Sequence, residues 1–326
     1  MNFESGEIIF LLSKITMLIY VIRRIAQSAA AILILLTLLF VVLNVLPGDA
    51  ALLAGDLRMA KNEEVIANIR AKWGLDKPLH IRYLTYMGNL LRCDLGTSYR
   101  TSNKVIDLII PKLFSTIKIV ITAFIAAVIV GIFLGFMAAL YRGTLIDVIL
   151  MIIAILGISM PRFWLGLMLM YYFAVIHNFL PASGTGDGSF LFIILPALTL
   201  SIPMIALIAR TTRSAVLDEI NHDHVRTARA KGLSNSAVNI KHIFRNSLLS
   251  IITIVGLQLG TVFANTVVVE KVFAWPGIGD LVVNSIFKRD IPAIQGCILV
   301  FALCFILINL FVDILYAFLD PRISYS

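Results

Sequence analysis

Charged residues and cysteine are scarce in this sequence. Only 14% of the 326 residues are Asp, Glu, Lys or Arg, whereas 60% are hydrophobic and the mean hydropathy is +0.95. A typical soluble domain has about 25% charged residues, so the composition excludes an ordinary soluble fold and indicates an integral membrane protein. Cys93, Cys297 and Cys304 have neither metal-ligand spacing nor a pattern from which disulfides can be inferred. We expect all three to be packing residues.

The sequence also lacks the motifs of enzymes. It contains no glycine-rich phosphate loop followed by Lys-Ser/Thr, no nucleophile elbow and no His-Glu-x-x-His zinc site. We therefore expect no catalytic residues, no metal site and no cofactor in this chain. The net charge of +8 is not arranged as a basic stripe with interleaved aromatic residues, so it does not indicate nucleic acid. Basic residues that flank apolar segments are instead an ordinary feature of membrane proteins.

Long uncharged segments are abundant, and each can supply the roughly 20 residues of a transmembrane helix. Helices are expected because backbone groups in lipid must be satisfied within the segment. The sequence thus predicts an all-α membrane protein with six transmembrane helices, the third interrupted by Arg162. Gly131 and Gly135 have the spacing of close helix packing. The six segments are residues 25–46, 119–141, 148–176, 190–209, 247–269 and 293–312.

The distribution of basic residues predicts the orientation of these helices. With six crossings, both termini lie on one side, together with residues 210–246. The short segments of that side carry twelve basic residues, whereas those of the other side carry only Lys271, Lys288 and Arg289. Short cytoplasmic segments are enriched in Lys and Arg. We therefore expect both termini and the 210–246 segment to be cytoplasmic.

Five segments describe the expected organisation of the chain. Residues 1–16 are expected to be an N-terminal extension, and residues 17–46 contain the first transmembrane helix. Residues 47–117 form a small extracytoplasmic subdomain, in which Asn62 begins a helix that Gly74 ends. Residues 118–320 form the transmembrane core, and residues 321–326 a C-terminal tail.

Residues 210–245 form a polar island between two apolar runs, with seven basic and three acidic side chains. A helix of small residues is predicted to end at Gly232, which can adopt a left-handed conformation, and Ser234 can cap the next helix. Two interpretations are open: a surface that binds a partner, or a solvated basic loop that only sets topology. For a partner, alanines would permit close approach and basic side chains would add charged contacts. The residues concerned are Arg226, Thr227, Ala228, Arg229, Ala230, Lys231, Gly232 and Leu233.

The same segment carries a resemblance to a known family. Thr227-Ala228-Arg229-Ala230-Lys231-Gly232, followed by residues 242–248, resembles the EAA loop of ABC-importer permeases. More closely, the chain after residue 17 resembles the B-type inner-membrane permease of the dipeptide/oligopeptide/nickel ABC importer family. The order and spacing of several short motifs carry the resemblance: Pro47-Gly48-Asp49, residues 74–78, 94–98, 159–166, 273–279 and 289–292, and Asp320-Pro321-Arg322.

The resemblance implies a type I ABC importer permease fold in the bacterial cytoplasmic (inner) membrane. It implies ATP-driven import of dipeptides or oligopeptides, or alternatively of nickel chelates or another small solute. Partners would be membrane lipid, a second homologous permease, two cytoplasmic ATPase subunits that bind ATP and Mg, and an extracytoplasmic solute-binding protein. Residues 226–233 would form the coupling helix on an ATPase. A secondary, ion-coupled transporter is the less favoured alternative, because the sequence offers no mid-span carboxylate.

Candidate residues for the translocation pathway come from the third and fifth spans. Pro161 can bend the third span and free carbonyl groups there. Gln258 and Asn265 are seven residues apart and predict a polar stripe, either toward a pore or for hydrogen bonds between helices. The sequence departs from the family at Ser250, where proline is common, and at Arg162, which can face the pathway or extend outward. The candidates are Ser159, Pro161, Arg162, Gln258 and Asn265.

Overall fold

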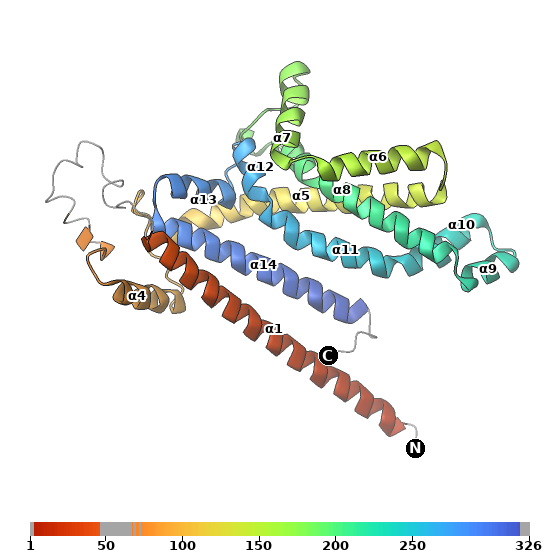
Figure 1. Ribbon diagram of the computed structural model, residues 1–326, viewed down its shortest axis with the longest axis horizontal. Helices are drawn as coiled ribbons and strands as arrows, with labels where there is room; N and C mark the ends of the chain where they lie inside the picture. Colours follow the sequence, from red (N-terminus) through yellow and green to blue (C-terminus); the bar gives the residue numbers. More distant parts are fainter. Residues whose placement is uncertain (1–2, 46–66, 68–69, 72, 320–326) are drawn as a thin grey trace. The chain divides into compact units, whose positions relative to one another are not determined.

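A computed structural model describes residues 3–45, 67, 70–71 and 73–319 of the chain. In these residues the secondary structure is helical, apart from one isolated bridge between Thr97 and Lys104. The elements in Figure 1 are α1 (Phe3–Val45), α4 (Leu79–Leu91), α5 (Val105–Leu140), α6 (Leu145–Ser159), α7 (Arg162–Met170), η1 (Tyr171–Ile176), η2 (Gly186–Gly188), α8 (Leu191–Ile220), α9 (Asp223–Ala230), α10 (Asn235–Ala237), η3 (Val238–Phe244), α11 (Arg245–Ala264), α12 (Thr266–Val272), α13 (Ile278–Phe287) and α14 (Ile291–Leu319).

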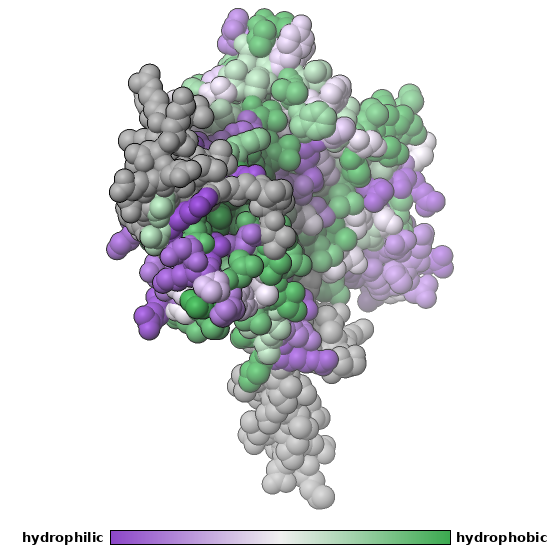
Figure 2. All heavy atoms as spheres, turned by 60° about the vertical axis from the view of Figure 1, so that its left-hand side comes forward, coloured by the Kyte–Doolittle hydropathy of each residue, from purple (hydrophilic) through white to green (hydrophobic). Residues whose placement is uncertain are grey.

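Five helices of the described residues are long and apolar enough to cross a membrane, and the number is six if a bent pair of helices counts as one span. Large apolar side chains such as Ile34, Ile129 and Val175 are at least 60% exposed. Figure 2 shows hydrophobic side chains over broad areas of the face in view. Such exposure is expected where lipid, rather than water, surrounds a helix. The five helices are Ile22–Asn44, Val105–Leu140, Leu191–Ile220, Asn235–Ala264 and Ile291–Asp313.

The third predicted span is bent rather than straight. The helix axis bends by 108° between helix α6 and the helix Arg162–Ile176. Between them, Met160 has extended dihedral angles (φ −77°, ψ 128°) because the ring of Pro161 disfavours the helical region for the residue before it. Each arm has 15 residues, about 22 Å of helix, which is shorter than the roughly 30 Å of a hydrocarbon core. Neither arm alone is long enough to cross that core, so the pair is either one broken span or a segment that enters and leaves the membrane on the same side.

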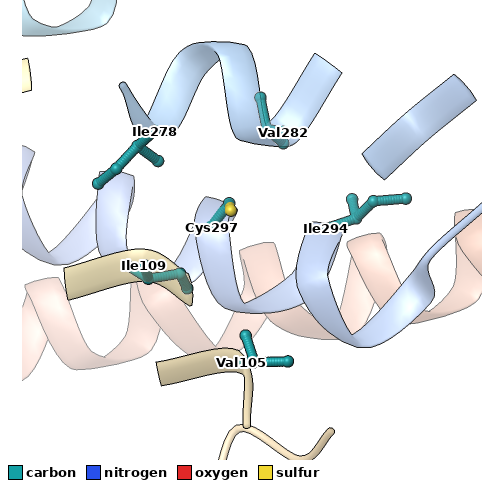
Figure 3. Close-up of a cluster of buried hydrophobic side chains, with 6 residues drawn as sticks. All are labelled: Val105, Ile109, Ile278, Val282, Ile294 and Cys297. Carbon is teal, nitrogen blue, oxygen red and sulfur yellow. The ribbon is translucent and has the colours of Figure 1, made fainter. Parts of the chain in front are cut away.

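The chain divides into two compact units, Met1–Phe114 with Gly277–Leu307 and Ser324–Ser326, and Ser115–Pro276 with Ile308–Ile323. The first unit has an apolar core in which α5, α13 and α14 meet (Figure 3). Cys297 is fully buried there, as expected of a packing residue, whereas Cys93 is exposed, so the prediction was wrong for Cys93. Asp290 is also buried and accepts hydrogen bonds from the Ser98 hydroxyl and from the Tyr99 N–H (3.0 Å). The core residues are Val105, Ile109, Ile278, Val282, Ile294 and Cys297.

Part of the 47–117 segment can be compared with its prediction. Asn62 lies outside the described residues. Residues 67, 70, 71 and 73 are helical, and Gly74 follows with φ +64°, which confirms that the helix ends there. Helix α5 begins at Val105, so the end of the predicted subdomain is continuous with the second span.

The second unit is organised around α8, which packs against α6, α7, α11 and α12. The predicted close packing at Gly131 and Gly135 is confirmed: they lie on α5 where it meets α8. A Cβ atom at Gly135 would be 2.3 Å from the carbonyl oxygen of Ala209. The absence of a side chain therefore lets α5 approach α8 just before α8 continues toward α9.

Candidate functional site

The polar island folds as helix α9 and the turns around it. One face of α9 is buried: Val225 is 0% and Ala228 is 4% exposed. This face packs with the ends of α5 and α8 and with η3. An eight-residue helix is marginal by itself, so its position is set by this apolar cluster. The cluster consists of Ala139, Val216, Val225, Ala228, Val238 and Ile243.

The other face of α9 is open to the surroundings. Ala228 differs from the other predicted coupling residues, because its side chain is buried in the apolar cluster of the permease itself. It is therefore not available for contact with a partner. The exposed face carries three basic side chains, of which Arg226 lies 3.7 Å from the carboxylate of Asp223 on the same face. The exposed residues are Arg226, Thr227, Arg229, Ala230, Lys231, Gly232 and Leu233.

Gly232 ends α9 in the predicted way. Its φ is +76°, the left-handed conformation that residues with a Cβ rarely adopt. The Gly232 N–H donates to the Arg229 carbonyl (2.9 Å), and the Leu233 N–H donates to the Ala228 carbonyl (3.4 Å). These two bonds form a Schellman motif, which satisfies carbonyl groups at the end of the helix.

The chain then enters the fifth span without another loop. The Ser234 hydroxyl accepts a hydrogen bond from the Ala237 N–H (3.4 Å), which confirms the predicted cap. Helix α10, the π-helix η3 and α11 follow one another directly from Asn235 to Ala264. Only the short turn at residues 231–234 therefore separates α9 from the helical stretch that continues into the fifth span. The π-helical segment was not predicted; such segments are rare and often mark functional sites.

An ion pair that sequence analysis did not find links α8 to α6. The Arg213 guanidinium donates twice to Asp147, at 2.6 Å from Nε to Oδ1 and 2.8 Å from the terminal nitrogen to Oδ2. The Asp147 side chain is only 6% exposed and also accepts from the Gly143 N–H (3.1 Å). Bidentate pairs of this kind fix geometry as well as charge. The start of α6 is thereby held to the part of α8 that leads to α9.

A second polar cluster joins three helices at the base of α9. Glu219 of α8 accepts a hydrogen bond from Asn246 of α11 (3.1 Å), and its carboxylate lies 2.9 Å from the ring nitrogen of His224 in α9. Sequence spacing could not find this cluster, because its members come from separate helices. This polar cluster therefore connects α8, α9 and α11, in addition to the contacts made by the apolar cluster.

The structure brings together two of the five predicted pathway residues. Arg162, the first residue of α7, donates from its guanidinium to the side-chain oxygen of Asn265, which follows the last residue of α11. Arg162 is half-buried and therefore does not simply extend outward. Gln258 accepts from Thr261 (3.3 Å) and Ser159 donates to the Ile155 carbonyl (2.8 Å), both within their own helices. Pro161 lies at the bend between α6 and α7.

Glu270 is a carboxylate whose burial the sequence did not predict. It is 0% exposed, and its Oε1 accepts a hydrogen bond from the Thr116 hydroxyl (2.5 Å). It lies in α12, beyond the residues of the apolar span Asn235–Ala264. It therefore lies beyond the end of that apolar helix rather than in its middle.

Two family models match the chain over most of its length. The model described as "Binding-protein-dependent transport system inner membrane component" matches residues 131–325, and the model of the N-terminal part of such membrane components matches residues 17–121. The chain belongs to this permease family.

Curated relatives agree with that assignment. The permease is 42% identical over 311 residues to proteins named glutathione transport system permease protein GsiC from Salmonella choleraesuis (strain SC-B67), Salmonella typhi and Escherichia coli (strain K12). The match covers 95% of the permease and 100% of each relative. It is thus an inner-membrane permease of the peptide/nickel-type ABC importers, as the sequence motifs predicted.

Solved structures show the same fold. The permease matches a chain of the MetNI methionine ABC transporter in inward facing conformations, with a TM-score of 0.53, 16% identity and coverage of 66% of this chain and 97% of that chain. It also matches an amino acid ABC transporter with histidines, with a TM-score of 0.50, 14% identity and coverage of 65% and 94%. The predicted type I ABC importer permease fold is confirmed.

Proposed function

We propose that this permease forms half of the translocation pathway of an ATP-driven importer for short peptides. The relatives named for glutathione transport support this substrate class, because glutathione is a tripeptide with an ammonium group and two carboxylates. The other half of the pathway comes from a second homologous permease. An extracytoplasmic solute-binding protein delivers the peptide, and two cytoplasmic ATPase subunits bind ATP and Mg. ATP is bound by these subunits rather than by the permease, whose sequence lacks a glycine-rich phosphate loop followed by Lys-Ser/Thr.

The exposed face of α9 couples the permease to an ATPase. The observation that carries this proposal is the division of α9 into a buried face, which fixes it to α5, α8 and η3, and an exposed face with Arg226, Arg229 and Lys231. In this proposal α9 and both termini are cytoplasmic. When the ATPases close on ATP, they displace α9. The displacement reaches α11 through the 231–234 turn and α6 through the Asp147–Arg213 pair.

The pathway residues keep the roles proposed from the sequence. Arg162 and Asn265 form a polar contact between α7 and the end of α11, where rearrangement of the spans would change the lining of a pathway. Gln258, Ser159 and Pro161 complete the proposed lining. Because Arg162 is half-buried, its bond with Asn265 compensates part of the cost of removing its charge from water.

Reconstitution of the assembled transporter tests this function. Both permeases, both ATPases and the binding protein are placed in proteoliposomes, and uptake of labelled glutathione and of a labelled dipeptide is measured with and without ATP. We expect uptake that needs every subunit and ATP. A purified monomer that imports these solutes without ATPase subunits would overturn the proposal.

Reversing the charge of Arg229 is expected to weaken ATPase binding. Arg229→Glu places a carboxylate on the exposed face of α9 and should reduce the affinity about tenfold at low salt. Because exposed charges are screened by salt, the difference from the wild type should shrink at about 1 M salt. The measurement is equilibrium binding of the ATPase subunit to the permease in nanodiscs.

Lys288→Glu provides the matched control for this charge reversal. Lys288 is also an exposed basic residue, but it lies on the opposite side of the membrane in the proposed topology. The Lys288→Glu variant should therefore bind the ATPase with the wild-type affinity at every salt concentration. Equal loss of affinity in both variants would show that α9 has no special role in binding.

A further inference from the structure

The first unit contains a cavity of about 370 Å³ that neither α9 nor the proposed pathway explains. We call it the α4 cavity, because α4 forms one wall. The end of α1, the residues on either side of α4 and the start of α14 form the others. Its volume falls in the range of small-molecule sites, about 300–1,000 Å³. In the proposed topology it opens on the extracytoplasmic side.

Two polar groups in the wall of the α4 cavity are buried without a hydrogen-bond partner. The Asn44 side chain donates from its nitrogen to the Phe40 carbonyl (2.7 Å), which leaves its Oδ1 as an unused acceptor. The Tyr86 hydroxyl is likewise buried and unpaired. Buried polar atoms nearly always have partners, so such atoms beside a cavity indicate a missing donor and a missing acceptor.

The Tyr86 hydroxyl is available as a hydrogen-bond donor. Its ring stacks on Phe40 with the centroids 5.8 Å apart. Burial raises the pKa of the Tyr86 hydroxyl to about 12, and neighbouring Tyr83 contributes in the same direction. The hydroxyl therefore keeps its proton at neutral pH. A carboxylate is a strong acceptor for such a donor.

The remaining wall combines positive charge with an aromatic surface. Lys77 and Arg82 both line the α4 cavity, whereas Asp94 is the one acidic residue among the described lining residues. Trp73 and Tyr99 stack at 4.0 Å with an interplanar angle of 9° and provide a flat apolar surface. A ligand that satisfies all of these groups needs an anion, an N–H donor and some apolar surface.

We propose that the α4 cavity binds a short peptide through its free carboxylate. The carboxylate pairs with Arg82 and accepts the Tyr86 hydrogen bond, a peptide or amino N–H donates to Asn44 Oδ1, and an apolar part of the ligand lies against Trp73. The proposal rests on the proposed short-peptide function for its ligand class. It adds a second peptide site on the permease itself, lined by other residues than those proposed for the transmembrane pathway.

Binding to the full chain in phosphatidylcholine nanodiscs tests the site without the other subunits. The probes are labelled alanyl-phenylalanine and labelled glutathione, with the C-terminal amide of the dipeptide as the probe that lacks the carboxylate. We expect saturable binding of the acids and at least about tenfold weaker binding of the amide. Inorganic phosphate at similar concentrations should not compete.

Isosteric variants with matched controls locate the binding. Arg82→Gln and Tyr86→Phe should each weaken dipeptide binding about tenfold or more, and Arg82→Gln should remove the difference between acid and amide. Arg92→Gln removes an exposed arginine at the end of the same helix, outside the cavity wall. Tyr83→Phe removes a hydroxyl that bonds to Thr37 (2.7 Å) and does not line the cavity. Both controls should bind as the wild type does.

Several results would overturn the peptide site. They are no binding of either probe up to about 10 mM, equal affinity for acid and amide, unchanged binding in both cavity variants, or displacement by phosphate as effective as by peptide. Failure of the proposed function would give a different result.

If the proposed function is wrong and the peptide site is right, the isolated permease binds peptide but the assembled transporter imports none. If the transporter imports peptide and the isolated permease does not bind it, the α4 cavity alone is excluded.

Discussion

Replacing Gly232 by valine is expected to abolish ATP-driven uptake while the permease remains folded. Gly232 has φ +76°, and apart from the glycine itself and its two chain neighbours none of the described residues has an atom within 4 Å of the position that a Cβ would occupy. The cost of the substitution is therefore backbone strain rather than a clash, about 1–3 kcal/mol for a branched residue in this conformation. Relief of that strain would break the two hydrogen bonds that end α9 and reorient the 231–234 turn. The measurements are solute uptake and the stimulation of ATP hydrolysis by the loaded binding protein.

Two comparisons separate this effect from general strain. Gly184→Val introduces the same strain in another loop, since Gly184 has φ +88° and open space around it. We expect that variant to keep the coupling between hydrolysis and uptake. Gly232→Asn should restore most of the activity, because asparagine tolerates the left-handed conformation better than other residues with a side chain. Normal uptake by Gly232→Val would show that the turn does not transmit the displacement of α9.

The features that the sequence predicted well are local ones. Gly232 and Ser234 each act on backbone groups within five residues, so their roles follow from residue type and spacing alone. The bend at Pro161 was expected for the same reason. Its angle of 108° was not, because the packing of α6 and α7 against α8 sets it. Helix α5 begins at Val105, well before the uncharged run that starts at residue 119, because Lys112 and Lys118 interrupt the apolar sequence. An uncharged run indicates the part of a helix that lies in lipid rather than the whole helix.

The features that the sequence could not predict depend on residues far apart in the chain. Arg213 and Asp147 are separated by 66 positions, and Arg162 and Asn265 by 103. In the sequence, each of these residues is only a charged or polar group near the end of an apolar run, and nothing there indicates its partner. The burial of Ala228 was also not predicted, because an eight-residue helix presents small residues on several faces and only tertiary packing selects one. The family motifs therefore marked residues 226–233, and the structure shows that this segment has one buried face and one exposed face.

Removing Asp147 is expected to lower the stability of the permease more than the loss of any exposed charge. In Asp147→Ala the guanidinium of Arg213, whose side chain is 27% exposed, loses its partner, and the Gly143 N–H loses its acceptor. Breaking a buried pair by removing one partner costs about 3 kcal/mol. The measurement is thermal unfolding of the purified permease. As the matched control, Asp223→Ala breaks the exposed pair with Arg226 and should leave the melting temperature nearly unchanged.

The double variant Asp147→Ala/Arg213→Leu separates two effects of removing Asp147. One is the destabilisation caused by an unpaired Arg213, and the other is the loss of the contact that joins α6 to α8. Without a buried charge to compensate, the double variant should recover much of the stability that Asp147→Ala loses, because apolar replacement of a buried pair is often nearly neutral. Uptake should nevertheless stay low, since no bidentate contact then holds α6 to the α8 segment that leads to α9. If stability and uptake recover together, the pair serves folding alone. If stability returns without uptake, the pair is part of the route by which α9 moves the bent third span.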